Sequence, residues 1–356
     1  MKWKIGWGIT NKCNMNCPFC YSKEAREDSE DISFEHAVRF IDENHSYIDS
    51  INYGTGENTL SENWRNVVKY VAENFPDIKQ ALTTNGYLSE IILSEEDKYL
   101  LKYLDEVDVS FDMANKNEFN KLRGVATAYD WAIQTIRLCK ESNIKITLVT
   151  ILIDKTINNE NIKNLLEIAR KDDCYFRLNI FRPNANQGLL PMNYRKIKDT
   201  LLWLLDQCSV VSLCDPLFSA LLTGEKKNDN SGKSSLRILP NGSITPSTYL
   251  VSEDWVFGNI KDEVSLNENP FRPNLNEISL ENNIPDDCKD CSIVEQCMGG
   301  AMDRRIIWHK TLKRRDPYCP FENNDNLSTW KNKSMKFIGK GPTIHDGYLP
   351  TLIFKP

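Results

Sequence analysis

Apolar residues along the first 207 positions follow two alternating spacings. Short β-branched runs such as 145–153 are typical of buried strands, whereas the stretches between them place apolar side chains three and four positions apart, as helices do. The pattern predicts strands at 3–10, 50–53, 81–84, 106–111, 145–153 and 175–181. It predicts a helix that begins after Ser33, a typical N-cap residue, and helices at 63–75, 95–104, 129–142, 159–171 and 193–207.

Six strand–helix units of this kind predict a parallel sheet and an α/β fold class. We expect an open, partial (β/α)6 barrel rather than a closed eight-stranded one, with functional residues at the C-terminal ends of the strands. The pattern changes after about residue 208, and the polar stretch 226–235 (KKNDNSGKSS) is typical of a linker. The predicted units are therefore a barrel at 1–225, a second domain at 226–325 and a C-terminal tail at 326–356.

The composition is ordinary for a globular protein: of 356 residues, 40% are hydrophobic and 26% are charged. The net charge of −6 gives no reason to expect nucleic-acid binding, because phosphate groups attract basic surfaces. The basic run 304–315 (RRIIWHKTLKRR) is the exception. We expect a solvated helix face there, with a docking patch for an acidic partner as the alternative.

The N-terminus shows no signal peptide, and no stretch is apolar enough to span a membrane. Eleven cysteines in such a chain point to metal binding or catalysis rather than to disulfides, and seven of them form two tight groups. These features predict a cytoplasmic protein with no membrane partner.

The first cysteine group, in the string CNMNCPFC, consists of Cys13, Cys17 and Cys20. Because four cysteines saturate a [4Fe-4S] cluster, three thiolates leave one iron open to another ligand. A zinc site is the alternative and requires four ligands. The nearest histidine is His36, and no fourth cysteine is close in the sequence. We therefore expect an iron–sulfur cluster with an open iron.

The C-x3-C-x2-C spacing, with Phe19 before the last cysteine, resembles the radical S-adenosylmethionine (radical SAM) superfamily. The resemblance implies that S-adenosylmethionine (SAM) chelates the open iron. It also implies that one electron from the reduced cluster cleaves SAM to a 5′-deoxyadenosyl radical, which takes hydrogen from an unactivated C–H bond. The cofactor supplies this chemistry, while the protein supplies position and excludes water.

Other segments resemble the family's cofactor contacts. YGTGE resembles the G-G-E motif that receives the methionyl amine, although Thr55 replaces its first glycine. TTNG resembles the third-strand element, and SFD followed by Arg123 resembles the fourth-strand element, while the end of the sixth strand often contacts cofactor or substrate. The cofactor-binding residues that this resemblance implies are Tyr53, Gly54, Gly56, Glu57, Asn85, Ser110, Arg123, Arg177 and Asn179.

The second group is a set of four cysteines, namely Cys288, Cys291, Cys297 and Cys319. A zinc site is a possible alternative here, but CKDCSIVEQCMGG resembles the auxiliary domain called SPASM. Ser247 and Ala301 stand where that domain has cysteines for its first auxiliary cluster. The resemblance therefore implies one auxiliary [4Fe-4S] cluster with four ligands, and two clusters in the whole protein.

Four cysteines remain outside these groups. Cys139 lies on an apolar helix and is expected in the core. Cys174, Cys208 and Cys214 are either buried small hydrophobes or, as in some relatives, hydrogen-atom donors to a substrate radical. Together with Asp112, which is expected to face the cavity, they are the candidate catalytic residues.

The resemblance implies a maturase that acts on a ribosomally made precursor peptide. The surroundings of the first two motifs are most similar to the splicease type, which excises a tyramine unit and leaves an α-keto-β-amino acid. Thioether or carbon–carbon crosslinking and epimerisation remain alternatives, as does dehydrogenation or decarboxylation of a small sugar or nucleoside. The first cluster begins at residue 13, so we expect a separate leader-recognition protein, and a flavodoxin- or ferredoxin-type reductant.

Overall fold

Six parallel strands form the centre of the computed structural model, which describes residues 2–23, 30–94, 97–183, 193–271, 279–330, 335–339, 341–342, 344–345 and 350–356. Each strand pairs in parallel with the next in the sequence. The strands are β1 (Trp3–Trp7), β2 (Ile48–Tyr53), β3 (Lys79–Thr84), β4 (Glu106–Ser110), β5 (Lys145–Leu152) and β6 (Tyr175–Ile180). The predicted α/β class and the six predicted strands are confirmed, with small differences at the strand ends.

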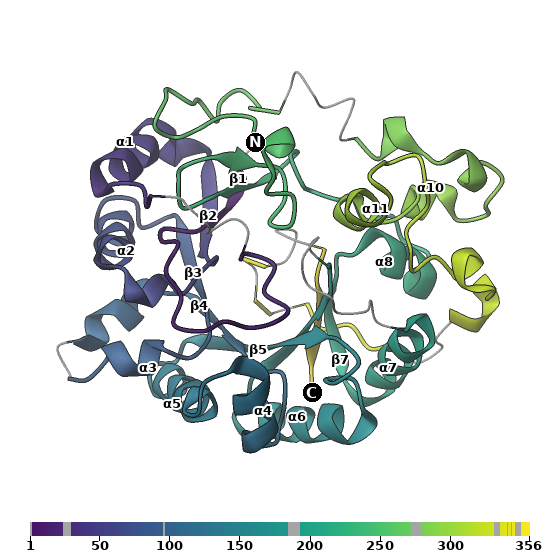
Figure 1. Cartoon of the computed structure of the whole chain (residues 1–356), viewed down its shortest axis with the longest axis horizontal. Coiled ribbons are helices and arrows are strands. Elements are labelled where there is room, and N and C mark those ends of the chain that lie inside the picture. Colours follow the sequence, from purple (N-terminus) through teal and green to yellow (C-terminus); the bar gives the residue numbers. More distant parts are fainter. Residues whose placement is uncertain are drawn as a thin grey trace.

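Helices connect these strands and lie on the outside of the sheet (Figure 1). The predicted helices correspond to α1 (Phe34–Asn44), α2 (Glu62–Asn74), α5 (Ala128–Glu141), α6 (Asn159–Lys171) and α7 (Tyr194–Gln207). Helix α1 begins where predicted, since the Ser33 side chain accepts a hydrogen bond from the backbone of His36. Its Phe40 packs edge-to-face against Trp7 of β1, so the Trp7 side chain points outward.

The sequence pattern was less accurate between β3 and β5. Within the predicted helix at 95–104, the described residues Asp97–Tyr103 form a 3-10 helix (η4), and residues 95 and 96 lie outside the described part. Two short helices were not predicted, α3 (Leu88–Ile91) and α4 (Lys116–Arg123). The side chain of Asn115 caps α4, and Gly124 ends it with a φ of 72°.

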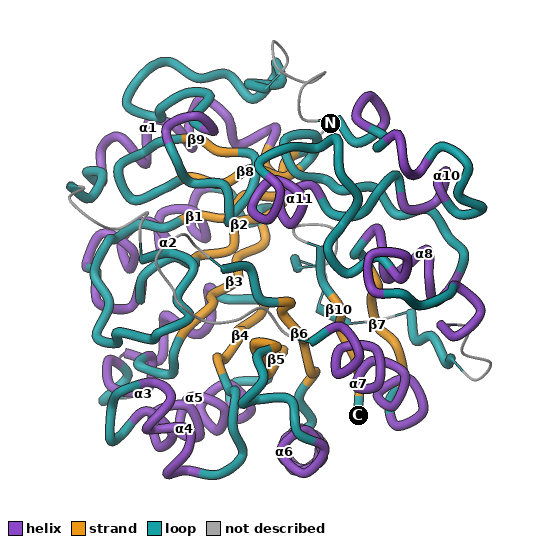
Figure 2. Tube along the Cα trace, turned by 45° about the vertical axis from the view of Figure 1, so that its right-hand side comes forward, coloured by secondary structure: helices purple, strands orange, loops and turns teal. Residues whose placement is uncertain are grey.

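The sheet is larger than the six predicted units. Among the described residues it has ten strands in the order β7-β10-β6-β5-β4-β3-β2-β1-β8-β9. After β7 (Ser209–Leu213) and α8 (Pro216–Thr223), strand β8 (Ser235–Ile238) returns to pair in parallel with β1 and forms a hairpin with β9 (Ile244–Thr245). The chain ends in β10 (Leu352–Lys355), antiparallel to both β6 and β7 (Figure 2).

Charged side chains fill the interior of the barrel near the N-terminal ends of the strands. Arg177 Nη1 lies 2.5 Å from Asp108 Oδ2, and His345 Nε2 lies 2.9 Å from the same oxygen. The backbone amide of Ile344 donates to Glu106, the first residue of β4. The C-terminal segment therefore packs into this end of the barrel, opposite the end at which the predicted functional residues lie.

The second predicted domain has little regular structure. Its described helices are α10 (Val294–Cys297) and α11 (Met302–His309), together with several short 3-10 helices. These 3-10 helices are η5 (Glu253–Trp255), η7 (Glu281–Asn283), η8 (Asp286–Cys288) and η9 (Pro320–Asn323). Three others lie outside this domain: η2 (His45–Tyr47) and η3 (Asn58–Leu60) in the barrel and η10 (Leu327–Trp330) in the predicted tail. Within the described residues, no helix is long and apolar enough to cross a membrane.

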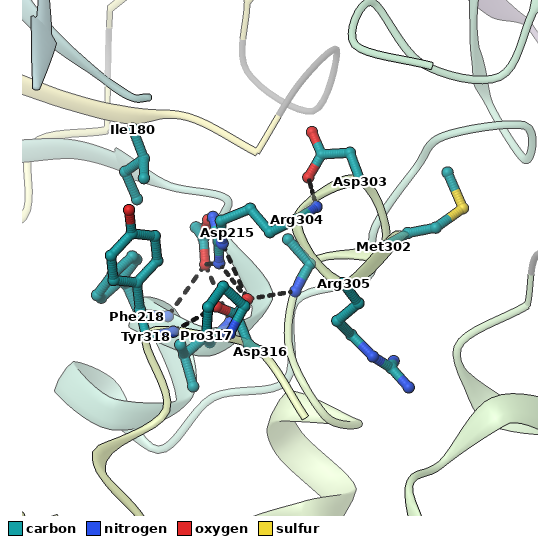
Figure 3. A network of polar contacts seen from close by, with 12 residues as sticks. Ile180, Asp215, Phe218, Met302, Asp303, Arg304, Arg305, Asp316, Pro317 and Tyr318 are labelled. Atoms are coloured by element: carbon teal, nitrogen blue, oxygen red, sulfur yellow. Dashed lines mark hydrogen bonds and ion pairs between the residues drawn. The ribbon is translucent and has the colours of Figure 1, made fainter. Parts of the chain in front are cut away.

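The expectation of a solvated or docking face at 304–315 is wrong for the arginines that begin it. Arg304 is completely buried, with its guanidinium between the carboxylates of Asp215 and Asp316 (Figure 3). Arg305 is also completely buried and donates to backbone carbonyls, including those of Met298 and Asn283. These arginines form an internal polar centre because they belong to α11, which is packed inside the protein.

Candidate active site

An open pocket of about 820 Å³ lies at the C-terminal ends of the parallel strands. The first cysteine group lines it, together with residues that follow β2, β3 and β4 and residues in the C-terminal halves of β5 and β6. Predicted residues among its walls are Cys13, Cys17, Cys20, Gly56, Asn85, Ser110, Asp112, Arg123 and Asn179. Loops separated by up to about half of the sequence thus converge on one cavity, as expected for a barrel of βα units.

The cysteine loop is anchored on both sides of the pocket. The Asp31 carboxylate accepts hydrogen bonds from the Thr10 hydroxyl and the Asn11 backbone, each at 2.6 Å. On the other side, Asn85 Nδ2 donates to Asn14 Oδ1 at 2.8 Å, which joins the cysteine loop to the end of β3. These contacts hold the thiols in place although the loop has no regular secondary structure.

Arg123 connects the thiols to the fourth strand. Its guanidinium forms an ion pair with Asp112, its Nη1 lies 3.7 Å from Cys17 Sγ, and its Cζ lies over the Phe19 ring, 5.1 Å from the ring centroid. Burial raises the pKa of the Cys17 thiol, and the charge of Arg123 opposes this effect. Asp112 is also fixed by the backbone amide of Ile151, which donates to its second oxygen.

The loop 54–57 has a conformation that its sequence does not favour. Thr55 has a φ of 81° and Gly56 a φ of 66°, and the first of these is strained because Thr is β-branched. The loop is held at both ends, since the Gly54 amide donates to Trp7 O and the Glu57 amide donates to Lys12 O. Thr55 and Gly56, between these two points, line the pocket.

Glu57 lies behind the pocket and joins the loop to β3. Its Oε1 accepts hydrogen bonds from the hydroxyls of Thr59 and Thr84, at 2.7 and 2.9 Å, and its Oε2 accepts one from the Asn85 amide at 2.7 Å. Burial raises the pKa of this carboxyl, and the hydrogen bonds only partly offset the effect. Glu57 therefore connects the loop 54–57 to the end of β3. It is not among the described residues that line the pocket.

Two other predicted cofactor residues also point elsewhere. The Tyr53 hydroxyl donates to Gln80 Oε1 at 2.7 Å, and its ring packs against Trp64 of α2 on the outside of the sheet. Arg177 precedes Asn179 by two residues on β6, and its guanidinium forms an ion pair with Asp108. Pocket residues that the sequence analysis did not select include Tyr21, Ser22, Thr83, Thr84, Val149 and Ile151.

The candidate catalytic cysteines outside the two groups do not line this pocket. Cys174 precedes β6 and Cys208 precedes β7, so both lie at the opposite ends of their strands, and both are buried. Cys214 follows β7, where its sulfur lies 3.1 Å from the Ser212 hydroxyl in a separate surface hollow. This placement argues against hydrogen-atom transfer from Cys174 or Cys208 to a molecule in the pocket.

The second cysteine group lines a smaller, narrow pocket. Cys288, Cys291, Cys297 and Cys319 all line it, together with apolar side chains such as Leu217 and Phe321. Within the described residues, no three or more His, Cys, Asp or Glu side chains form a group that would hold a single metal ion. Four cysteine thiolates are a common ligand set for a [4Fe-4S] cluster.

The first thiol group fits the implied cofactors in its donor chemistry. Three thiols from one short loop border an open pocket that also contains backbone groups at 55–56 and the polar side chains of Asn85 and Ser110. Thiolate is the usual donor to iron–sulfur clusters, and a fourth thiol is absent from the described lining. The pocket therefore has thiol ligands for three irons of a cluster, and next to these thiols it has polar groups that suit a charged cofactor.

Comparisons with known proteins agree with this geometry. Residues 7–169 match the family model described as the Radical SAM superfamily. The chain is 28% identical over 173 residues to Fe-coproporphyrin III synthase of Methanosarcina barkeri, and 22% identical over 165 residues to the sporulation killing factor maturation protein SkfB of Bacillus subtilis. These matches cover 45% and 46% of this chain but only 38% of each relative.

The fold extends the similarity beyond the matched domain. The crystal structure of Streptococcus suis SuiB bound to the precursor peptide SuiA aligns with a TM-score of 0.66 and 16% identity, over 90% of this chain and 76% of SuiB. At this level of identity the alignment shows a shared fold. Residues 7–169, which carry most of the cysteine-lined pocket, are thus similar to the Radical SAM superfamily, and the structural alignment shows a shared fold over 90% of this chain.

Proposed function

We propose that this protein is a radical SAM enzyme that modifies a precursor peptide. The observation that carries the proposal is the convergence of Cys13, Cys17 and Cys20 with Gly56 and Ser110 on one pocket at the strand ends. When bound, a reduced [4Fe-4S] cluster and SAM supply a 5′-deoxyadenosyl radical. The residues of this chain bind, orient and enclose these groups.

Different residues of the pocket bind different parts of the cluster and of SAM. The three thiols hold the cluster and leave one iron for the amine and carboxylate of SAM. Backbone carbonyls in the loop 54–57 suit the ammonium group, and the side chains of Asn85 and Ser110 suit hydroxyl or carboxylate oxygens. Met15, Phe19, Val149 and Ile151 form apolar walls, which exclude water from a reactive intermediate.

The second thiol group is proposed to hold an auxiliary [4Fe-4S] cluster. Its four cysteines saturate such a cluster, so no iron remains open to substrate. We propose a role in electron transfer or in structure. The polar centre around Arg304 supports the structural role, because Asp316 lies three residues before Cys319 and pairs with this arginine.

A peptide substrate is supported by two kinds of similarity. SkfB is a maturation protein by name, and SuiB has been solved with a precursor peptide bound. Within this class we propose backbone splicing with excision of a tyramine unit, a separate leader-recognition protein, and a flavodoxin- or ferredoxin-type reductant. Fe-coproporphyrin III synthase, named for a porphyrin, keeps small-molecule chemistry as the alternative.

The cofactor part of the proposal is tested without knowledge of the substrate. The protein is reconstituted anaerobically with iron and sulfide, reduced, and incubated with SAM, and 5′-deoxyadenosine is measured by chromatography. We expect its formation in the parent protein and its loss in Cys13→Ala, Cys17→Ala and Cys20→Ala. Formation of 5′-deoxyadenosine by these variants at the parental rate would contradict the proposal.

For the substrate part, the neighbouring genes are searched for a short precursor peptide, which is then incubated with the reduced enzyme and SAM and analysed by mass spectrometry. Loss of a tyrosine side chain with part of its backbone supports splicing. Loss of two hydrogens supports crosslinking instead, and an unchanged mass with altered stereochemistry supports epimerisation. An unmodified peptide, together with turnover of a sugar, nucleoside or porphyrin, would overturn the peptide assignment.

A further inference from the structure

Arg237 of β8 reaches the cofactor loop from outside the matched radical SAM domain. It is 1% exposed, and its Nη2 donates a hydrogen bond to the carbonyl of Gly54. The two residues are 183 positions apart. Arg237 does not belong to the described lining of the pocket, so any effect on a bound cofactor passes through the loop.

Two glycines make this contact possible, Gly6 of β1 and Gly8, which directly follows this strand. In the sheet, Gly6 lies directly between Arg237 of β8 and Asn52 of β2. Trp7 points outward to Phe40, so Gly6 and Gly8 face the inside of the barrel. Because neither glycine has a side chain, the Arg237 side chain can extend across the interior face of β1 and reach Gly54, which follows β2.

Gly8 also fits closely under the loop. A Cβ atom at position 8 would lie 2.8 Å from Thr55 Cβ and 3.2 Å from Gly54 O, closer than side chains pack. The loop therefore packs directly against the backbone at Gly8, just after β1, and is held from the β8 side by the guanidinium of Arg237. A hydrogen bond from a charged donor is stronger than one between neutral groups.

The hydrogen bond acts on the peptide unit that precedes the strained residue. The Gly54 carbonyl belongs to the plane that joins Gly54 to Thr55, and Thr55 has a φ of 81°. Fixing this plane removes the rotation by which Thr55 would relax to a negative φ. Relaxation would turn the backbone at 55–56, the part of the loop that borders the pocket.

We propose that Arg237 is a positioning residue for the cofactor loop: it fixes the Gly54 carbonyl and thereby holds Thr55 and Gly56 in the conformation that receives the amine of SAM. The inference rests on the proposed function for the role of the loop. It also makes the segment after the barrel part of the cofactor site, since β8 lies beyond residue 169, where the family match ends.

The test compares the parent with Arg237→Lys and Arg237→Gln, and uses Arg39→Lys as the matched control. Arg39 of α1 also donates to backbone carbonyls, those of Ile260 and Lys261, but on the outside of the barrel. Hydrogen exchange is measured first, on the protein without added cofactor. We expect the amides at 54–57 to exchange at least tenfold faster in both Arg237 variants, with those of β4 and β5 unchanged.

The second measurement is binding to the reconstituted cluster protein of SAM and of its analogue without the α-amino group. We expect the parent to prefer SAM, and the Arg237 variants to bind SAM at least tenfold more weakly and to lose most of this preference at unchanged iron content. Arg39→Lys keeps both properties. Arg237→Gln serves as the test if Arg237→Lys does not fold.

The outcomes separate the two proposals. If the parent prefers SAM over the analogue and a folded Arg237 variant retains that preference and the parental exchange rates, the inference about Arg237 is overturned. If the parent itself shows no preference for the amine, the role proposed for the loop is overturned. Faster exchange at 54–57 would then still report that Arg237 holds the loop, but not that this serves the cofactor.

Discussion

Asp215 and Arg304 form a completely buried ion pair although 89 positions separate them in the sequence. Arg304 Nη2 lies 3.0 Å from Asp215 Oδ1, and both side chains are inaccessible to solvent (Figure 3). Asp215 also caps α8 by accepting from the amides of Leu217 and Phe218. Arg304 joins this helix to Asp316 and hence to the last cysteine of the second group.

Replacement of Arg304 by Met should strongly destabilise the protein. The carboxylates of Asp215 and Asp316 would remain buried without their cation, and breaking a buried pair in this way costs roughly 3–5 kcal/mol. Urea unfolding measures the difference. Lys313→Met, at an exposed position of the same basic run, is the control and should change the free energy of unfolding by less than about 0.5 kcal/mol. Equal stability of the two variants would contradict the prediction.

The pair Lys233–Glu281 predicts a pH dependence. Partial burial would raise the pKa of Glu281, but hydrogen bonds from Lys233 and Ser279 outweigh it and lower the pKa to about 2. A pKa that is lower in the folded state stabilises the protein above the unfolded value, and this contribution disappears as the pH falls toward 2. Because the pair is partly exposed, we expect up to about 1 kcal/mol.

The variant Glu281→Gln tests this dependence. It should be less stable than the parent at pH 6, and the two unfolding free energies should converge as the pH is lowered from about 4.5 to about 2, the interval in which Glu281 loses its charge. Glu225→Gln, at an exposed ion pair with Lys227, is the control. A constant difference between Glu281→Gln and parent at all pH values would contradict the assignment.

Glu57→Gln should weaken the connection between the cofactor loop and β3. The Glu57 carboxyl accepts hydrogen bonds from the hydroxyls of Thr59 and Thr84 and from the backbone amides of Thr59 and Asn85. An NH2 in place of Oε2 would face the Asn85 amide, which can only donate, and an NH2 in place of Oε1 would make the Thr59 and Thr84 hydroxyls turn to accept. Losing these buried hydrogen bonds costs about 1–3 kcal/mol. Thermal unfolding measures the loss, and the exposed Glu62→Gln is the control; identical transitions would disprove this role.

Iron content should separate the two cysteine groups. Two cubane clusters correspond to about eight irons per chain after anaerobic reconstitution. Cys17→Ala should retain about four, held by the second group, and Cys297→Ala about four, held by the first. Cys139→Ala, at a buried position outside both groups, should retain all of them. Zinc bound without colour in the parent would contradict both cluster assignments.

Deletion of residues 351–356 should prevent stable folding. It removes β10, whose Ile353 and Phe354 are completely buried and pair with both β6 and β7. The loss would expose an edge of each of these strands, and unpaired edges promote aggregation. Soluble yield and the melting temperature measure the effect. Lys355→Ala keeps the strand and should behave like the parent; a soluble truncated protein with an unchanged melting temperature would refute the prediction.

Much of the barrel could be predicted because its signals are local. Ser33 caps α1 and Asn158 caps α6, and in each case the side chain accepts a hydrogen bond from an amide three residues later. The alternation of apolar runs reports which face of an element is buried, and this repeats within each element. Helix α4 was missed because it is short and its apolar pattern is weak, so its Asn115 cap and Gly124 end were the better signals.

The motif positions were predictable for the same reason, but the directions of individual side chains were not. Tyr53 and Arg177 belong to the predicted set and point away from the pocket, toward α2 and toward Asp108. Strand register and the packing of neighbouring elements decide these directions. The sequence carries no local signal for them.

The spacing of the cysteines and the order of strands and helices already predicted an α/β barrel with two thiol groups, because these patterns recur at short spacings along the chain. The return of β8 to β1, the insertion of β10 between β6 and β7, and the burial of Arg237 and Arg304 became visible only in the folded chain. These features depend on contacts between residues about ninety or more positions apart, such as Arg237 with Gly54. Charge and hydropathy at one position do not indicate which distant carboxylate or carbonyl will meet it.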